Sequence, residues 1–252
     1  MIPEIRRVAC VGSGLVGQGW AALFVLNGYS VVLHDLKEEV LREAVSRVEN
    51  HVRFLVESGL DGDADSALEL IETVTTLTKA VGSADFVMES VYESYEVKKS
   101  VFSEMDRVAP EDTILASSTS GLLMTEIQRA VELHPERCIV AHPWNPVHLI
   151  PLVELSPGEL TSRRTVERTC AVMENIGKVP VVLRKEVPGF IANRLSAALW
   201  REALDLVDSG VASVEDVDKA VRAGPGIRWA IMGPYLTYHL GGGAGGIEYL
   251  MR

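Results

Sequence analysis

The sequence has no hydrophobic run approaching the roughly 18 residues of a membrane-spanning helix, although 47% of its 252 residues are hydrophobic. It also lacks the order of a signal peptide, because Arg6 and Arg7 precede the first apolar run, which leads directly into a glycine motif. Only 23% of the residues are charged, and this balance is typical of a globular chain that buries a core. We therefore predict a cytoplasmic, globular protein with no membrane partner.

Cysteine is scarce, and its three positions, Cys10, Cys138 and Cys170, show no metal-ligand spacing. Two of them lie in apolar, strand-like runs, so we expect buried free thiols in a reducing compartment and no metal site. The acidic stretch 61–65 lacks the register and the later glutamate of an EF-hand. We interpret it as a solvated turn.

An excess of positive charge is also missing, since 24 Lys and Arg residues face 35 Asp and Glu residues and give a formal net charge of -11. Nucleic-acid binding needs clustered basic side chains, so this composition argues against such a partner. The same negative field would repel an anionic substrate, which would require a cation supplied by the site itself. The sequence has no internal repeat, and its one low-complexity tract is the glycine-rich stretch 241–246.

A glycine motif follows the first apolar run, Val8–Val11, and has the spacing G-x-G-x-x-G at Gly12, Gly14 and Gly17. A helical segment and a second apolar run that ends at Asp35 complete a βαβ unit typical of dinucleotide binding. The first glycine would allow the tight turn, the second would let the backbone approach a pyrophosphate, and the third would let the helix pack on its strand. Asp35 would accept hydrogen bonds from the adenosine ribose hydroxyls.

The helix after this turn begins near Leu15 and Val16, whose backbone positions we assign to the cofactor site together with the glycines. Unpaired N–H groups and the partial positive charge of a helix N-terminus suit the phosphates. Asp35 without a nearby arginine favours NAD over NADP, because a 2′-phosphate would face a carboxylate. Lys37 lies close in sequence but is not expected to reverse this preference.

Strand-like and helical segments alternate through most of the chain after Asp35. A helical face ending at Gly59 includes Leu41, Val45 and Val48, and later segments repeat the pattern. The expected strands cover residues 73–78, 84–91, 113–117, 137–142, 151–155 and 179–183, with helices from 94 to 105 and from 162 to 175. Such alternation predicts an α/β protein with a Rossmann-type doubly wound parallel sheet, which we place in residues 1–185.

The pattern changes after Glu186, where no further strand is expected and residues 186–252 form a smaller all-helical domain. Pro188 suits a helix start, and a buried helical face is expected to run to Gly210 through Ile191, Leu195, Leu199, Ala203 and Leu206. Ser213 to Asp216 resembles a capping box for a second helix. A domain of this size has little core of its own, so we expect it to need a partner surface.

Polar residues that could take part in catalysis fall at the ends of the expected strands. Ser120, His142 and Glu154 lie there, on the edge where open α/β sheets bind ligands, and Asn193 begins the helical part. His142 stands in a loop made rigid by two prolines. Glu154 interrupts an otherwise apolar strand and needs a buried partner, for which an imidazole is well suited.

Several motifs together resemble the 3-hydroxyacyl-CoA dehydrogenase family, and within it the branch of lambda-crystallin, L-gulonate 3-dehydrogenase and L-carnitine dehydrogenase. They are Val11-Gly-Ser-Gly-Leu-Val-Gly17, Glu89-Ser-Val-Tyr-Glu93, Ser117-Ser-Thr-Ser120, Ala141-His-Pro-Trp-Asn-Pro146, Pro151-Leu-Val-Glu154, Val187-Pro-Gly-Phe-Ile-Ala-Asn-Arg194 and Met232-Gly-Pro234. The resemblance covers essentially the whole chain and implies an NAD-dependent dehydrogenase. Related chains usually continue with more helix beyond the equivalent of Arg252, so either this chain is shortened or its tail is missing.

The resemblance also implies roles for individual residues. His142 matches the catalytic base, Glu154 its orienting carboxylate, and Ser120 and Asn193 the polar groups around the reacting oxygen. Neutral imidazole would take the hydroxyl proton, and Glu154 would stabilise the imidazolium that forms. Glu93 and Lys98 match positions near the nicotinamide and its ribose, with a surface pair at a helix start as the alternative. The family further implies a homodimer.

The sequence leaves several substrates open. His-Pro-Trp-Asn-Pro looks like the lambda-crystallin and carnitine branch, whereas the acyl-CoA enzymes typically show His-Phe-Phe-Asn-Pro. Arg228 could bind a small carboxylate bidentately or form a structural ion pair, and on this basis we expect a 3-hydroxy acid such as L-gulonate.

L-carnitine is the close alternative, because its quaternary ammonium would suit an aromatic face such as Trp144, Trp229 or Tyr238. An acyl-CoA substrate is a third possibility. A crystallin-like structural protein or an NAD-binding protein without catalysis forms a different class. Such a protein would have no need for His142 together with Glu154, so their joint presence favours an enzyme.

Overall fold

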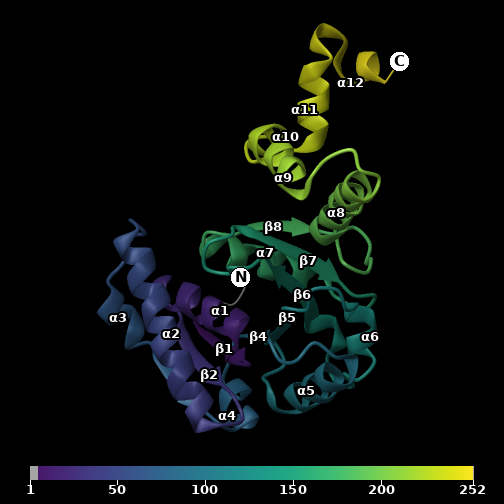
Figure 1. Ribbon diagram of the computed structural model, residues 1–252. Coiled ribbons are helices and arrows are strands. Elements are labelled where there is room, and N and C mark those ends of the chain that lie inside the picture. The colour runs from purple at the N-terminus through teal and green to yellow at the C-terminus, as the bar shows by residue number, and fades with distance from the viewer. Residues whose placement is uncertain (1–4, 252) are drawn as a thin grey trace. The chain divides into compact units, whose positions relative to one another are not determined.

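The computed structural model describes residues 5–251, and the chain divides into two compact units (Figure 1). The first unit ends at Ile191 and the second begins at Ala192. The division thus falls later than the expected boundary near Lys185. The reason lies in the core, since Phe190 is completely buried among side chains of the first unit.

An eight-stranded sheet forms the centre of the first unit, with the strand order β3-β2-β1-β4-β5-β6-β7-β8. The strands are β1 (Arg7–Val11), β2 (Ser30–His34), β3 (Ile71–Val74), β4 (Phe86–Glu89), β5 (Ile114–Ser117), β6 (Cys138–Pro143), β7 (Leu152–Pro157) and β8 (Val179–Val182). Neighbouring strands are parallel except for β6 and β7, which are antiparallel. The predicted Rossmann-type fold is confirmed, with one reversed strand pair that the sequence pattern did not predict.

Helices cover both faces of this sheet. They are α1 (Leu15–Leu26), α2 (Glu38–Glu57), α3 (Ala64–Leu68), α4 (Leu77–Val81), α5 (Tyr95–Val108), α6 (Met124–Gln128) and α7 (Arg163–Asn175), with a 3-10 turn η1 (Pro135–Arg137). Alternate residues of β1 face opposite ways: Val8 and Cys10 pack with α1, α2 and α7, and Ala9 and Val11 pack with α4, α5 and α6. The sheet is therefore buried on both sides, as parallel sheets require.

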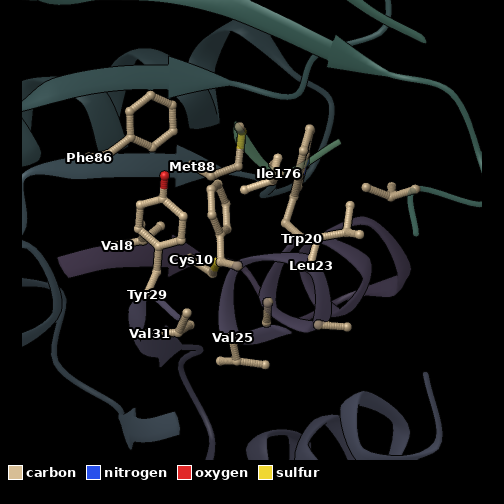
Figure 2. Packing of buried hydrophobic residues seen from close by; sticks show 14 of the residues in the cluster. Val8, Cys10, Trp20, Leu23, Val25, Tyr29, Val31, Phe86, Met88 and Ile176 are labelled. Carbon is tan, nitrogen blue, oxygen red and sulfur yellow. The ribbon is translucent and has the colours of Figure 1, made fainter. Parts of the chain in front are cut away.

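The core on the α1 side is dense with aromatic rings (Figure 2). Phe24 is 5.9 Å from Trp20, 5.6 Å from Tyr29 and 6.1 Å from Phe86, measured between ring centroids. All four rings are buried, so this cluster fixes α1 against β1 and β4. The glycine turn before α1 is thereby held at the carboxyl edge of the sheet.

Two local predictions for the first unit were wrong in part. The expected strand 73–78 ends at Val74, and Leu77 begins the short helix α4, because Leu77, Ala80 and Val81 are buried against the sheet. In the stretch interpreted as a solvated turn, the Asp63 side chain accepts a hydrogen bond from Ser66 N and caps α3.

The second unit consists of helices: α8 (Ala192–Asp208), α9 (Val214–Ala223), α10 (Pro225–Trp229), α11 (Pro234–Gly241) and α12 (Gly246–Leu250), with the 3-10 turn η2 (Gly243–Gly245). The expected capping box is present, since Ser213 Oγ accepts a hydrogen bond from Asp216 N. Helix α8 starts at Ala192 rather than at Pro188, because Gly189 and Phe190 have left-handed backbone conformations that a helix does not admit.

The buried face expected for α8 is not found, since no residue of this helix is buried in the described chain. Leu195 is instead 59% exposed and Leu199 is 40% exposed, while Ala203 and Leu206 are half-buried. A unit of this size has too little surface of its own to cover such a face.

The thiols of the three cysteines are free, with Cys10 and Cys138 buried and Cys170 half-buried. Burial raises the pKa of the Cys10 thiol to about 12, so this group stays protonated near neutral pH.

None of the helices within residues 5–251 has both the length and the apolar character needed to span a bilayer. In the same part of the chain, no group of three potential ligands among His, Cys, Asp and Glu could hold a metal ion.

Candidate active site

The glycine turn between β1 and α1 is shaped by close backbone approaches. Gly12 has a positive φ of 95°, and a Cβ there would lie 2.7 Å from the carbonyl oxygen of Ser90. A Cβ at Gly17 would collide with the carbonyl oxygen of Gly12, so α1 packs on the turn only with glycine at this position. By contrast, a Cβ at Gly14 would meet nothing within 4 Å, which leaves its backbone open to a ligand.

Asp35 closes this turn from the end of β2. Its Oδ2 accepts hydrogen bonds from Ser13 N at 3.0 Å and from Ser13 Oγ at 2.8 Å, and its Oδ1 accepts one from Leu36 N. Burial tends to raise the pKa of this carboxyl, but the bonds from Ser13 and Leu36 outweigh burial and hold the pKa below its usual range. The carboxylate therefore faces the glycine turn in its charged form.

A cavity of about 700 Å³ runs along this edge of the sheet. The glycine turn and Asp35 line one side, while Leu36, Leu77 and Val101 supply apolar walls. Open backbone at Gly14, a charged ribose acceptor and apolar walls together match the needs of the adenosine and pyrophosphate of a dinucleotide. Leu15 begins α1 with its side chain 75% exposed.

A second cavity of about 220 Å³ adjoins the first and shares Ser90 and Val91 with it. Predicted site residues from four separate segments meet there: Val16, Glu93, Lys98, Ser120 and His142. The structure thus gathers the expected catalytic histidine and the expected nicotinamide-side residues around one space.

A buried ion pair lies at this cavity, because Lys98, one of its lining residues, pairs with Glu89. Lys98 Nζ lies 2.7 Å from Glu89 Oε1, and both side chains are almost completely buried. Glu89 also accepts hydrogen bonds from Val91 N at 2.7 Å and from Ser117 Oγ at 2.6 Å. These bonds tie the ends of β4 and β5 to the start of α5, and they exclude the alternative of a surface pair for Lys98.

Glu93 connects this pair to the loop that contains Ser120. Its Oε1 accepts hydrogen bonds from Thr119 Oγ1 at 2.5 Å and from Ser120 N at 2.9 Å, and its Oε2 lies 3.4 Å from Lys98 Nζ. Burial tends to raise the pKa of Glu93, but the Thr119 hydroxyl, the Lys98 charge and the Ser120 N–H hold it below its usual range.

His142 and Glu154 form the central pair of the site. They are register partners in the antiparallel strands β6 and β7, and His142 Nδ1 lies 2.9 Å from Glu154 Oε2. Both side chains are buried. A carboxylate at Nδ1 sets the tautomer with the proton on Nδ1, which leaves Nε2 as the basic ring atom.

A buried lysine holds the loop that follows the strand of His142. Lys178 Nζ donates hydrogen bonds to the carbonyl oxygens of Val147 and Ile150, and it lies 5.6 Å from the ring centroid of Trp20. Burial lowers the pKa of Lys178 to about 8. The connection between β6 and β7 is thereby held close to α1.

Asn193 lies in α8 and Arg228 in α10, both in the second unit, and the structure describes each unit by itself. Their approach to His142 therefore stays a prediction.

Three residues that the sequence analysis missed contribute to the first unit's site, namely Glu89, Ser117 and Phe190. Glu89 is a buried acid at the end of the otherwise apolar strand β4, as Glu154 is a buried acid within β7, so a similar signal would have found it.

Comparisons with known proteins cover nearly the whole chain. The model of the 3-hydroxyacyl-CoA dehydrogenase, NAD binding domain, matches residues 7–187, and that of the 3-hydroxyacyl-CoA dehydrogenase, C-terminal domain, matches residues 189–252. L-carnitine dehydrogenase of Oceanobacillus iheyensis is 42% identical over 249 residues, which cover 98% of this chain and 80% of that protein. L-carnitine dehydrogenase of Burkholderia mallei is 44% identical over 252 residues, which cover 100% of this chain and 78% of that protein.

A solved structure shows the same likeness. The 5-formyl-3-hydroxy-2-methylpyridine 4-carboxylic acid 5-dehydrogenase, described as an NAD+ dependent dismutase, is 35% identical with a TM-score of 0.86. The superposition covers 94% of this chain and 76% of that one.

The fold, the glycine turn and the family matches together define an NAD-dependent dehydrogenase. More narrowly, the chain belongs to the 3-hydroxyacyl-CoA dehydrogenase family, and it matches the models of both of that family's domains. Among substrates, the relatives support L-carnitine, the alternative in the sequence analysis, better than L-gulonate, the substrate expected first.

Proposed function

We propose that this protein oxidises the 3-hydroxyl group of L-carnitine to a ketone with NAD. The observation that carries the proposal is the buried His142–Glu154 pair beside the cavity lined by Glu93, Lys98 and Ser120. Relatives with the name L-carnitine dehydrogenase, 42% and 44% identical along nearly the whole chain, support the choice of substrate.

The chemistry that NAD supplies when bound is acceptance of a hydride from the carbon that bears the hydroxyl, which yields the keto product, NADH and a proton. His142 Nε2 takes the hydroxyl proton, because Nδ1 is engaged by Glu154 and only Nε2 has a lone pair to offer. Glu154 stabilises the imidazolium that forms. Ser120 and Asn193 donate hydrogen bonds to the reacting oxygen as negative charge develops on it.

The charge of the protein fits a zwitterion better than a polyanion. With a formal net charge of -11, the chain repels acyl-CoA substrates, whereas L-carnitine has no net charge and includes a quaternary ammonium. Trp144 directly follows the strand of His142 and is the proposed aromatic partner of this ammonium. Arg228 is the proposed partner of the substrate carboxylate.

The test is a substrate panel with NAD, followed by NADH absorbance. We expect the highest kcat/KM with L-carnitine, and lower values with D-carnitine, L-gulonate, L-3-hydroxybutyrate and L-3-hydroxybutyryl-CoA. L-3-hydroxybutyrate is the matched control, because it keeps the carboxylate and the 3-hydroxyl but lacks the ammonium. A higher kcat/KM with L-gulonate or the CoA ester would refute L-carnitine as the substrate.

We further propose that the protein acts as a homodimer, as its family resemblance implies. The exposed apolar face of α8 is compatible with such an assembly, since no residue of this helix is buried in the described chain. Light scattering of the purified protein measures the mass directly, and a monomeric mass at assay concentration would reject this proposal.

A further inference from the structure

The chain leaves the first unit through an unusual backbone turn beside the catalytic pair. Within residues 5–251, Phe190 is the one non-glycine residue with a positive φ, at 53°, and Gly189 before it has a φ of 75°. Side chains other than glycine rarely adopt this conformation, and a bulky aromatic residue is an outlier there. The surrounding structure must therefore hold Phe190 in place.

Two contacts connect this turn to the catalytic pair. The Phe190 ring is completely buried, and its centroid lies 5.3 Å from that of the His142 ring. The next residue, Ile191, donates its backbone N–H to Glu154 Oε1 at 2.8 Å. Glu154 is thus held at both oxygens, because its Oε2 lies 2.9 Å from His142 Nδ1.

The left-handed conformation explains why both contacts occur at once. Phe190 N donates a hydrogen bond to the carbonyl oxygen of Val187, which closes a tight turn. The reversal of the backbone at Gly189 and Phe190 places the ring on one partner of the pair and directs the following N–H to the other. Pro188 and Gly189 are the central residues of this turn, and the positive φ of Gly189 is the one that a type II turn requires at its second central position.

We propose that Phe190 is a positioning residue, which fixes the His142 ring by packing and fixes Glu154 through the N–H of Ile191. This inference rests on the proposed function only for the statement that His142 is the base. The ring limits the imidazole to one orientation, and the N–H limits the carboxylate to one rotamer. Their loss misplaces the base without changing the cofactor cavity.

The kinetic test compares two leucine variants of buried phenylalanines. Phe190→Leu removes the ring from His142, and Phe102→Leu is the matched control, because Phe102 is equally buried in the same hydrophobic cluster but belongs to α5. We expect Phe190→Leu to lower kcat by about 10-fold to 100-fold, the scale of a misplaced reacting group. The KM for L-carnitine and the Kd for NAD should stay within about twofold, since neither binding surface changes.

A spectroscopic test reports on the hydrogen bond from Ile191 to Glu154 and requires no turnover. In protein labelled with 15N-isoleucine, the Ile191 amide signal is assigned from its disappearance in Ile191→Val, which keeps the backbone N–H. Replacing the carboxylate by Glu154→Gln should shift this signal upfield, because a neutral amide accepts a weaker hydrogen bond. Phe190→Leu should shift it in the same direction, and Phe102→Leu should leave it in place.

The two tests separate this inference from the proposed function. If the intact protein oxidises none of the panel substrates, the proposed function fails, and the amide signal alone decides on the positioning role. If Glu154→Gln leaves the Ile191 amide unchanged, or if Phe190→Leu lowers kcat no more than Phe102→Leu does, the positioning role is wrong. Rescue of kcat in Phe190→Tyr, which keeps an aromatic ring, would support it further.

Discussion

His142 and Glu154 face each other across the antiparallel pair β6 and β7, as register partners whose side chains meet at 2.9 Å. Residues directly opposite in such a pair project from the same face of the sheet. The geometry of the proposed base and its carboxylate is therefore set by backbone pairing within the sheet rather than by a flexible loop.

This relationship predicts the effect of removing either group. His142→Gln should lower kcat with L-carnitine by about 100-fold to 10000-fold, the range of general base catalysis. Glu154→Gln should also lower kcat strongly, because the amide no longer stabilises the imidazolium. Stopped-flow or steady-state NADH absorbance measures both effects, and NAD affinity measured by calorimetry should stay unchanged. Full turnover in His142→Gln would reject the mechanism.

Asp35 should contribute to cofactor affinity and selectivity. Its carboxylate accepts hydrogen bonds from Ser13 N and Oγ, and it would accept others from the ribose of NAD. Asp35→Ala should raise the Kd for NAD by roughly 10-fold to 100-fold, since a hydrogen bond to a charged group contributes about 1.5–3 kcal/mol. The preference over NADP should decrease, because the 2′-phosphate no longer faces a negative charge.

Calorimetric titration with both cofactors gives these constants. Glu43→Ala, on the exposed face of α2, serves as the control for a lost carboxylate. A tighter Kd for NADP than for NAD in the unaltered protein would contradict the assigned selectivity.

The Glu89–Lys98 ion pair should matter strongly for stability. Glu89→Gln leaves the Lys98 ammonium buried, with Glu93 Oε2 at 3.4 Å as the nearest other carboxylate. Breaking a buried pair in this way costs about 3–5 kcal/mol in the free energy of unfolding, which urea denaturation measures. The double variant Glu89→Gln with Lys98→Met should recover part of the loss, because no charge stays buried. No recovery would show that the cost comes from lost packing.

His148 should make the protein sensitive to acid. Its ring stacks on His51 with centroids 4.0 Å apart, and burial, followed by the charges of His51 and Lys178, lowers its pKa from 6.5 to about 4. Between these values the unfolded chain binds a proton that the folded protein does not. The free energy of unfolding should therefore decrease as the pH falls from 6.5 to 4. The decrease should be well below the roughly 3.4 kcal/mol that such a pKa shift would give in a fully shielded group, because solvent screens this partly exposed ring.

The variant His148→Phe isolates this contribution, because it keeps a stacked ring and removes the titration. Urea denaturation at several pH values should show a smaller decrease toward pH 4 for the variant than for the unaltered protein. The acid-sensitive carboxylates contribute equally to both proteins. If the free energy of unfolding decreased equally with pH in both proteins, the pKa of His148 in the folded protein would not be lowered, and the prediction would be wrong.

Trp144 should act on substrate affinity more than on turnover. A quaternary ammonium over an aromatic face gains about 0.5–2 kcal/mol. Trp144→Leu should therefore raise the KM for L-carnitine by roughly 2-fold to 30-fold with little change in kcat, while Trp144→Phe keeps most of the affinity. L-3-hydroxybutyrate, which lacks the ammonium, should show no such change, and an equal change would assign Trp144 to packing.

Much of the first unit could be predicted because its sequence signals are local. The spacing of Gly12, Gly14 and Gly17 and the position of Asp35 define a βαβ unit. The partnership of His142 with Glu154 was predictable for a different reason, since an acid in an apolar strand must find a buried partner. The structure places the two side chains in contact.

Other features were predictable in principle but were missed. The connection between Pro143 and Leu152 is too short for the crossover of about a dozen or more residues that a parallel pair requires, so the reversal of β7 could have been inferred. Residues 77–78 follow a threonine-rich stretch that favours strands, yet the burial of Leu77 and Val81 outweighs this local propensity and forms α4.

The remaining features depend on tertiary structure alone. Nothing in the type of residue at position 190 indicates a left-handed conformation, because that conformation is imposed by the ring's burial and by the hydrogen bond from Ile191 to Glu154. The roles of Asn193 and Arg228 depend on how the second unit meets the first, which local patterns do not encode.

The hydrogen bond from Ile191 to Glu154 also restricts how this chain can be recombined with its relatives. A hybrid protein joined near Lys185 would take Phe190 and Ile191 from one parent and His142 and Glu154 from the other. The junction that keeps these four residues together follows Ile191, where the first compact unit ends. Exchange of the helical unit at that point would leave the catalytic pair and its two supporting residues unaltered.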